Sequence, residues 1–365
     1  MKILAIETSC DETGAAVVEK DEKGLIKVLS NVIATSSSLH AKTGGIIPES
    51  AAREQIKFMI PVIVAALIES KNKAKLSSGN KFKYAKHILT SIDAIAVTHG
   101  PGLIGSLLVG VETAKTLSFA LNKPIIPVHH LLAHLYANFI GEISNFKFQI
   151  SNIQFPFIGL IVSGGHTDLL YFKSHSNFKW LGGTRDDAAG EALDKIGRIL
   201  GLPYPSGPEI EKRANKIQGS TLKFQSPLIN SEDFDFSFSG LKTEVARFIQ
   251  EERDRLSPEI GVTDLGNICY AVQEAIFDVL IKKTIRAAKL YKTWTILLGG
   301  CVSANQTLRK SFEQSIINNK LSMQIFSPEK KFATDNAAMI GAYALLNYKP
   351  VNWEKIKAQP DLYFD

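Results

Sequence analysis

The chain has 365 residues, of which 45% are hydrophobic and 21% charged, and its net charge is +6. This composition is that of a globular protein with room for two domains, and it excludes a largely disordered chain. The three cysteines, Cys10, Cys269 and Cys301, are far apart and outside any Cys-x-x-Cys pattern. We therefore expect neither a disulfide framework nor a zinc ribbon, and a reducing compartment fits best.

The apolar segments do not indicate secretion or membrane insertion. The apolar run 3–6 ends at Glu7, which makes it too short for the core of a signal peptide. The longest apolar stretch, 59–68, contains Pro61 and is too short to span a bilayer. We expect a cytoplasmic protein with no membrane partner, whose positive charge favours polyanions.

The first half of the chain predicts alternating strands and helices. Residues 3–6 read as a buried strand, followed by a polar turn at 7–14 and a second strand at 15–19. Apolar spacing predicts a helix over 49–69, and small residues predict a close-packed helix over 105–121. Between these helices lies a strand at 94–97, and after them a short strand at 124–128, with a helix expected to open at His130.

The second half repeats the opening pattern. Residues 157–162 read as a strand, 163–168 as a small polar turn and 169–172 as a strand. This repeat of strand, turn and strand predicts a duplicated α/β domain. The remaining elements are helices over 190–200, 272–291, 305–318 and 337–345, and strands over 295–298 and 322–326.

Two insertions, at about 70–90 and 141–155, have polar or irregular composition, and we expect surface loops there. The first contains six lysines, Lys71, Lys73, Lys75, Lys81, Lys83 and Lys86. A lysine-rich stretch of this kind is either a solvated loop or a contact for a nucleic-acid backbone.

His130 and His134 are four residues apart at the predicted start of a helix. This spacing puts both imidazoles on one face, within reach of one metal ion. The alternative is that two polar residues merely occupy the start of a helix. Asp335, before the helix at 337–345, is a candidate third ligand, although an Asp at this position is usually a helix N-cap. Two imidazoles and one carboxylate leave positions open for a substrate.

Glycine-rich turns follow three predicted strands, at 100–102, 163–165 and 299–300. Ligands of open α/β sheets bind beyond the carboxyl ends of the strands, and glycine lets backbone N–H groups approach phosphates. Three such turns in equivalent places predict a nucleotide-type ligand. Asp194, four residues after Gly190 on one predicted helix, is a candidate for binding ligand hydroxyls, although an exposed helical Asp usually has no such role.

Nine segments, in order along the chain, resemble those of the tRNA N6-adenosine threonylcarbamoyltransferase family, formerly labelled O-sialoglycoprotein endopeptidase. They are Ile6 to Thr13, His40 to Glu49, Gly100 to Leu107, His130 to His134, Val162 to Thr167, Asp186 to Lys195, Phe236 to Lys242, Gly300 to Asn305 and Thr334 to Asn336. The resemblance implies an actin-like α/β fold with two duplicated lobes, the ASKHA architecture. It implies a first lobe of 1–129 plus about 337–365 and a second of 130–336, with ligand and metal in the cleft between them.

The resemblance also implies the site residues. A divalent metal, Fe²⁺ first and Zn²⁺ second, would be held by His130, His134 and Asp335. The adenylate would be bound by Ile161, Val162, Ser163, Gly164, Gly165, Asp194, Gly207 and Asn305. Asp11 and Glu12 match an acidic turn that faces this pocket, and either is a candidate for taking a proton. Leu132-Ala133 stand where the family often has Glu-Gly, which leaves the support of the metal ligands undetermined.

The activity that the resemblance implies is transfer of a threonylcarbamoyl group from threonylcarbamoyl-AMP to N6 of adenosine 37 in tRNAs that read codons starting with A. This forms t6A. The implied partners are tRNA, an inactive paralogue subunit and a P-loop ATPase subunit, since the chain length and the His129-His130 doublet favour the bacterial type of assembly.

Three alternatives belong to other classes. A zincin protease needs Glu directly after its first metal histidine, where this chain has Leu131. An actin-like ATPase or kinase would use the glycine turns but has no need of the histidine pair. A non-catalytic scaffold paralogue would be expected to lack the metal triad.

Overall fold

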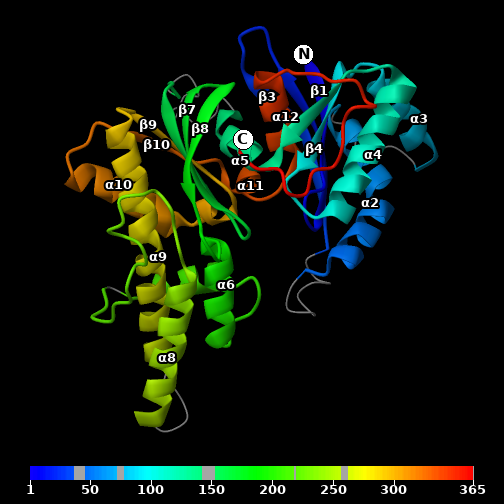
Figure 1. Cartoon of the computed structure of the whole chain (residues 1–365). Helices are drawn as coiled ribbons and strands as arrows, with labels where there is room; N and C mark the ends of the chain where they lie inside the picture. The colour runs from blue at the N-terminus through cyan, green and yellow to red at the C-terminus, as the bar shows by residue number, and fades with distance from the viewer. Residues whose placement is uncertain (37–45, 72–77, 142–152, 218, 256–261, 365) are drawn as a thin grey trace. The chain divides into compact units, whose positions relative to one another are not determined.

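The computed structural model describes residues 1–36, 46–71, 78–141, 153–217, 219–255 and 262–364 (Figure 1). Contacts divide the chain into two compact units. Unit 1 comprises Met1–Asn152 and Pro328–Asp365, and unit 2 comprises Ile153–Ser327.

Unit 1 is built on a mixed five-stranded sheet with the order β3-β2-β1-β4-β5. Its strands are β1 (Lys2–Glu7), β2 (Glu12–Lys20), β3 (Ile26–Thr35), β4 (Ala94–Gly100) and β5 (Ile125–His129). β1, β2 and β3 form an antiparallel meander, whereas β1, β4 and β5 run parallel. The carboxyl ends of β1, β4 and β5 therefore lie along one edge of the sheet.

Helices pack on this sheet because successive side chains of its strands point to opposite faces. Leu4 and Ile6 share a core with Met59 and Val111, which belong to α2 (Pro48–Glu69) and α4 (Ile104–Leu121). α12 (Ala337–Leu346) contacts β1 and β2, and Gly341 lies so close to Val18 that only a glycine fits without displacement. The shorter helices of unit 1 are α3 (Ser78–Leu89), α5 (His130–Tyr136), η1 (Ala137–Phe139) and α11 (Lys330–Ala333).

Unit 2 repeats the topology of unit 1. Its sheet has the order β10-β9-β6-β7-β8, in which β6, β7 and β8 are antiparallel and β6, β9 and β10 are parallel. The strands are β6 (Phe157–Val162), β7 (Thr167–Ser174), β8 (Asn177–Gly183), β9 (Thr295–Gly299) and β10 (Gln324–Phe326). The predicted duplication is therefore confirmed at the level of strand order and direction.

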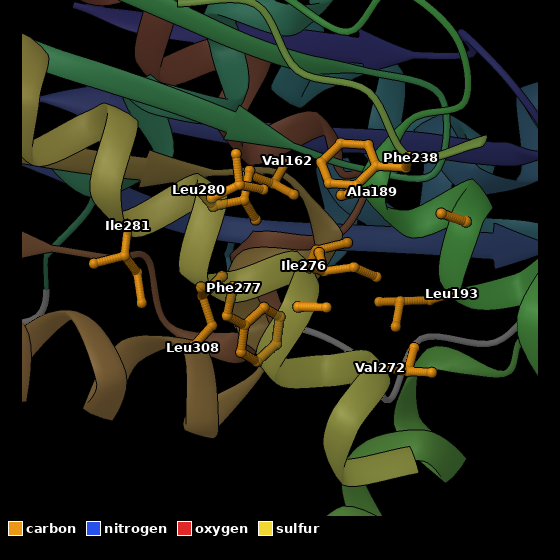
Figure 2. Close-up of a cluster of buried hydrophobic side chains, with 14 of the residues drawn as sticks. Val162, Ala189, Leu193, Phe238, Val272, Ile276, Phe277, Leu280, Ile281 and Leu308 are labelled. Carbon is orange, nitrogen blue, oxygen red and sulfur yellow. The ribbon is translucent and has the colours of Figure 1, made fainter. Parts of the chain in front are cut away.

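The core of unit 2 is formed by one face of β6 and the helices that cover it. These helices are α6 (Ala189–Ile199), α7 (Gly207–Ala214), α8 (Ser239–Arg255), α9 (Val262–Leu290) and α10 (Gln306–Asn318). Figure 2 shows Val162 at the end of β6 in one cluster with Leu193 of α6 and with Ile276 and Leu280 of α9. Burial of this apolar surface fixes the carboxyl end of β6 against the start of α6.

Most predicted elements are confirmed, with bounds shifted by up to about three residues, although α9 begins at Val262 and not at the predicted residue 272. The insertion at 70–90 is an exception, because it contains α3 and not only a loop. Ala85 and Ile88 of α3 are buried, while Lys81 and Lys83 remain exposed. The helix therefore presents a narrow apolar stripe that the many lysines mask in the sequence. Residues 72–77 and 142–152, with most of the second insertion, lie outside the described residues.

The units also begin and end at other residues than the predicted lobes. We predicted boundaries at 129/130 and 336/337, whereas unit 1 extends to Asn152 and begins again at Pro328. The reason is that α5 follows β5 directly and packs against α12. His130, His134 and Asp335 therefore all belong to unit 1.

Among the described helices, α4 alone combines the length and the apolar composition that a membrane span requires. It contacts β4 and α2 within unit 1. A helix that packs against a sheet is often as long and as apolar as a membrane span, so these two properties of α4 are also those of a helix in a protein core.

Candidate functional site

Two histidines and one carboxylate of unit 1 converge as the sequence predicted. α5 begins at His130, directly after β5, and its four-residue spacing brings His134 to the same face. Nε2 of His134 lies 3.2 Å from Oδ1 of Asp335, and Nε2 of His130 lies 3.7 Å from the same oxygen. One ligand atom from each of the three residues lies within 4.8 Å of the others.

Asp335 is available for this site because it does not cap α12. The N-cap is Asn336, whose Oδ1 accepts a hydrogen bond from the backbone N–H of Met339 at 3.1 Å. The alternative role that the sequence allowed for Asp335 is therefore taken by its neighbour. Two imidazole nitrogens and one carboxylate oxygen form a donor set that suits Zn²⁺ or Fe²⁺ and leaves coordination positions open.

His130 and His134 differ in their surroundings. Nδ1 of His130 lies 3.2 Å from Oε2 of Glu7, the last residue of β1. Neither ring nitrogen of the buried His134 makes a well-formed hydrogen bond among the described residues, and Nε2 has only the close approach of Asp335 at 3.2 Å. A buried imidazole paired this poorly is costly unless something binds there, which fits the use of His134 as a metal ligand.

The electrostatics of this cluster are dominated by crowded carboxylates. Burial would lower the pKa of His130, but the negative charges of Glu7 and Asp335 outweigh it and raise that pKa to about 9. Burial, followed by the charge of Asp335, raises the pKa of Glu12 to about 10. For Glu7, burial acts to raise the pKa, but the charge and hydrogen bond of His130 lower it on balance. Such a concentration of acidic groups attracts a cation.

Asp11 and Glu12 lie at the turn between β1 and β2, next to the metal-binding residues. A hydrogen bond between the two side chains and the charge of Asp335 both act on Glu12, so the structure brings these three residues together. The backbone of this turn is held by Ser36, whose hydroxyl donates to the carbonyl of Asp11 at 2.8 Å, and by Gln55, whose amide donates to the carbonyl of Glu12 at 2.8 Å.

In unit 2 the predicted glycine turn follows β6. The backbone N–H of Ser163 donates to the carbonyl of His166 at 2.8 Å, which closes the turn. Gly164 and Gly165 have open space where a Cβ would stand, so a ligand can approach their backbone. The side chains of Ile161 and Val162 are fully buried, and only the backbone of these two residues can reach a ligand.

Two other glycines pack against this turn and leave no room for a side chain. A Cβ on Gly190 would lie 2.6 Å from the carbonyl oxygen of Ser163, and a Cβ on Gly300 would lie 2.4 Å from that of Val162. Gly300 also has φ +90°, a conformation that other residues rarely adopt. The turns after β6 and β9 and the start of α6 therefore meet at one place.

Asp194, Gly207 and Asn305 all have structural roles in unit 2. Oδ1 of Asp194 accepts the backbone N–H of Ser206 at 2.6 Å, which ties α6 to the turn that precedes Gly207. Burial raises the pKa of Asp194 despite the hydrogen bonds from the backbone of Ser206 and Gly207. Asn305 is the N-cap of α10, since its Oδ1 accepts from the backbone N–H of Leu308 at 3.0 Å.

Glu7 is the residue of this site that sequence reasoning missed. Its signal is a carboxylate at the end of an otherwise apolar buried strand, a position where an unpaired charge is costly. Leu132 and Ala133, which replace the family's frequent Glu-Gly, are buried apolar residues of α5.

Comparisons with known proteins agree with this geometry. A family described as "tRNA N6-adenosine threonylcarbamoyltransferase" (TsaD) matches residues 27–342. A relative of that name from Moorella thermoacetica is 40% identical over 362 residues, 99% of this chain and 96% of its own. Another from Persephonella marina is 44% identical over 352 residues, 96% of this chain and 90% of its own.

Among solved structures, full-length HypF in a phosphate- and nucleotide-bound form has a TM-score of 0.57 at 12% identity. The match covers 95% of this chain and 46% of that one. HypF from T. kodakarensis gives a TM-score of 0.56 at 14% identity, over 95% of this chain and 48% of its own. These neighbours share the actin-like ASKHA-type fold. From the family match and the near full-length relatives together, the chain belongs to the tRNA N6-adenosine threonylcarbamoyltransferase family.

Proposed function

We propose that the chain transfers the threonylcarbamoyl group of threonylcarbamoyl-AMP to N6 of adenosine 37 in tRNAs that read codons starting with A. The single observation that supports this most is the convergence of His130, His134 and Asp335 within 4.8 Å in a member of this family. An inactive scaffold would have no need to keep these three residues together.

The proposed reaction is an acyl-type transfer. N6 of adenosine attacks the carbonyl carbon of the mixed anhydride, a C–N bond forms, and the C–O bond to AMP breaks with the electron pair leaving on AMP. The attacking nitrogen loses one proton, which needs an acceptor. Asp11 and Glu12 are the proposed acceptors, because both lie at the turn beside the histidine pair. Glu12 would accept the proton only when ionised, and a bound cation would favour that form by opposing the charge of Asp335 that raises its pKa.

His130, His134 and Asp335 would hold one divalent metal ion, for which Fe²⁺ is the first candidate and Zn²⁺ the second. When bound, the ion supplies Lewis-acid polarisation and stabilises negative charge. The buried imidazole of His134, which makes no well-formed hydrogen bond among the described residues, and the surrounding carboxylates support the presence of a cation at this position.

We further propose that the adenylate contacts the turn after β6 through backbone groups. The residues that would supply these groups are Ile161, Val162, Ser163, Gly164 and Gly165. The open space at the two glycines suits the close approach of a phosphate. Asp194 and Asn305 would act largely by fixing the positions of the Gly207 turn and of α10, in addition to any direct contact.

A tRNA substrate is in keeping with the net charge of +6 and with a cytoplasmic location. We propose an assembly with an inactive paralogue subunit and a P-loop ATPase subunit. Reconstitution of activity with each candidate partner, alone and together, tests the proposed assembly independently of the proposed reaction.

An assay with threonylcarbamoyl-AMP and unmodified tRNA tests the proposed function. We expect t6A to form with release of one AMP per modified nucleoside, both with and without ATP hydrolysis by partner subunits. ATP hydrolysis without modification would point to the ATPase or kinase alternative. Absence of both activities, with every partner combination present, would leave the scaffold role.

A further inference from the structure

The proposed chemistry does not use Glu7, although this carboxylate is fully buried at the carboxyl end of β1. A buried charge persists only where its oxygens are well paired. The contacts of Glu7 therefore indicate which neighbour it supports.

Both oxygens of Glu7 are held in fixed positions. Oε1 accepts a hydrogen bond from the backbone N–H of Ser9 at 2.6 Å. Oε2 accepts a hydrogen bond from the hydroxyl of Thr98, a fully buried residue of β4. The side chain is thus held by the turn after β1 and by β4, and cannot rotate without breaking these bonds.

Oε2 also faces Nδ1 of His130 at 3.2 Å, while Nε2 of the same ring faces Asp335. Metal binding requires the neutral ring of His130, and in that ring the carboxylate, as an acceptor, favours the proton on Nδ1. Nε2 then has its lone pair on the side of the metal-binding residues.

We infer that Glu7 is a positioning residue that fixes the ring orientation and tautomer of His130 for metal binding through Nε2, with Thr98 holding the carboxylate in place. The inference rests on the proposed metal site. It also explains how the site is supported where Leu132-Ala133 replace the polar pair that the family often has. His134 lacks an equivalent partner among the described residues, so the two ligands are supported unequally.

Glu7→Gln tests the inference with little change in volume. An amide has one acceptor oxygen, so the variant loses either the hydrogen bond from Ser9 or the acceptor that receives Thr98 and faces His130. The second arrangement places NH₂ against Nδ1 of His130, and both arrangements remove the negative charge that favours a proton there. We expect the affinity of the full chain for Zn²⁺, titrated against a competing chelator, to fall about 10- to 100-fold. Glu112→Gln, an exposed carboxylate on α4, is the matched control and should leave the affinity unchanged.

A second measurement uses the wild-type protein and therefore does not depend on how well the variant folds. In the Zn²⁺-loaded chain, the ¹⁵N NMR signals of His130 should show metal at Nε2 and a proton at Nδ1. Thr98→Val, which removes one donor to the carboxylate, should weaken Zn²⁺ binding less than Glu7→Gln does.

The outcomes separate the inference from the proposed function. Metal bound through Nδ1 of His130, or a folded Glu7→Gln variant with wild-type affinity, would overturn the role of Glu7 while leaving the metal site intact. A wild-type chain that binds neither Zn²⁺ nor Fe²⁺ would instead overturn the metal site, and the role of Glu7 with it.

Discussion

Oδ1 of Asp335 lies 3.2 Å from Nε2 of His134, although the two residues belong to the two separate chain segments that make up unit 1. The contact exists because α5 and α12 pack together at one end of the sheet. It brings a carboxylate to a pair of imidazoles that the local sequence places on one helix face.

Removal of both imidazoles should abolish metal binding. We expect the double variant His130→Ala/His134→Ala to fall from about one bound ion per chain to nearly none, because one carboxylate holds a divalent ion weakly. Elemental analysis of the purified protein measures this. His87→Ala, on the exposed side of α3, is the control and should retain the ion. Unchanged metal content in the double variant would exclude the proposed ligands.

Neutralising the acidic turn should affect chemistry more than binding. Asp11→Asn combined with Glu12→Gln removes both candidate proton acceptors, and we expect turnover to fall about 10²- to 10⁴-fold. Binding of threonylcarbamoyl-AMP, measured by calorimetry, should change only a few-fold. If turnover persists at the wild-type rate, neither residue takes the proton.

A methyl group at Gly190 should displace the turn after β6, since its Cβ would lie 2.6 Å from the carbonyl oxygen of Ser163. Overpacking of this kind costs about 1–3 kcal/mol, so we expect adenylate binding to weaken about tenfold or more. Gly240→Ala is the matched control, because Gly240 is also the second residue of a helix but has open space around it. Equal affinities for the two variants would argue against adenylate binding at the turn.

Asp186 should stabilise unit 2 in a pH-dependent way. Its carboxylate accepts hydrogen bonds from the hydroxyls of Ser237 and Ser239 and from the backbone N–H groups of Phe238 and Ser239. Burial acts to raise its pKa, but these hydrogen bonds outweigh burial and lower the pKa. Its stabilising contribution is thus present above the unfolded-state pKa and is lost as the pH falls through the lower, folded-state pKa.

We therefore expect Asp186→Asn to lower the free energy of unfolding by about 1 kcal/mol at pH 7, since solvent screens this exposed carboxylate, and by much less below pH 3. Urea unfolding at both pH values measures the difference. Asp361→Asn, at an exposed position, should show no such dependence. A loss that is the same at both pH values would mean that the charge of Asp186 is not what stabilises the fold.

Much of the fold follows from local patterns. The run of apolar residues 3–6 predicts β1, and the run 157–162 predicts β6, because a continuous apolar strand must be buried on both faces. The spacing of four between His130 and His134 puts them on one face of any helix, so their proximity needs no tertiary information. α3 escaped prediction because its apolar stripe is narrow and lies among lysines.

What the sequence by itself determined is therefore most of the strands and helices, the repeat and the histidine pair; β3, β8, α3, α7 and α8 were not predicted. Only the tertiary structure decided that Asn336 and not Asp335 caps α12, that Asp335 reaches His134, and that Glu7 supports His130 from β1. The physical reason is that contacts within a helix depend on spacing along the chain, whereas contacts between β1, α5 and the segment before α12 depend on the order of strands in the sheet. That order is set by the packing of the whole unit.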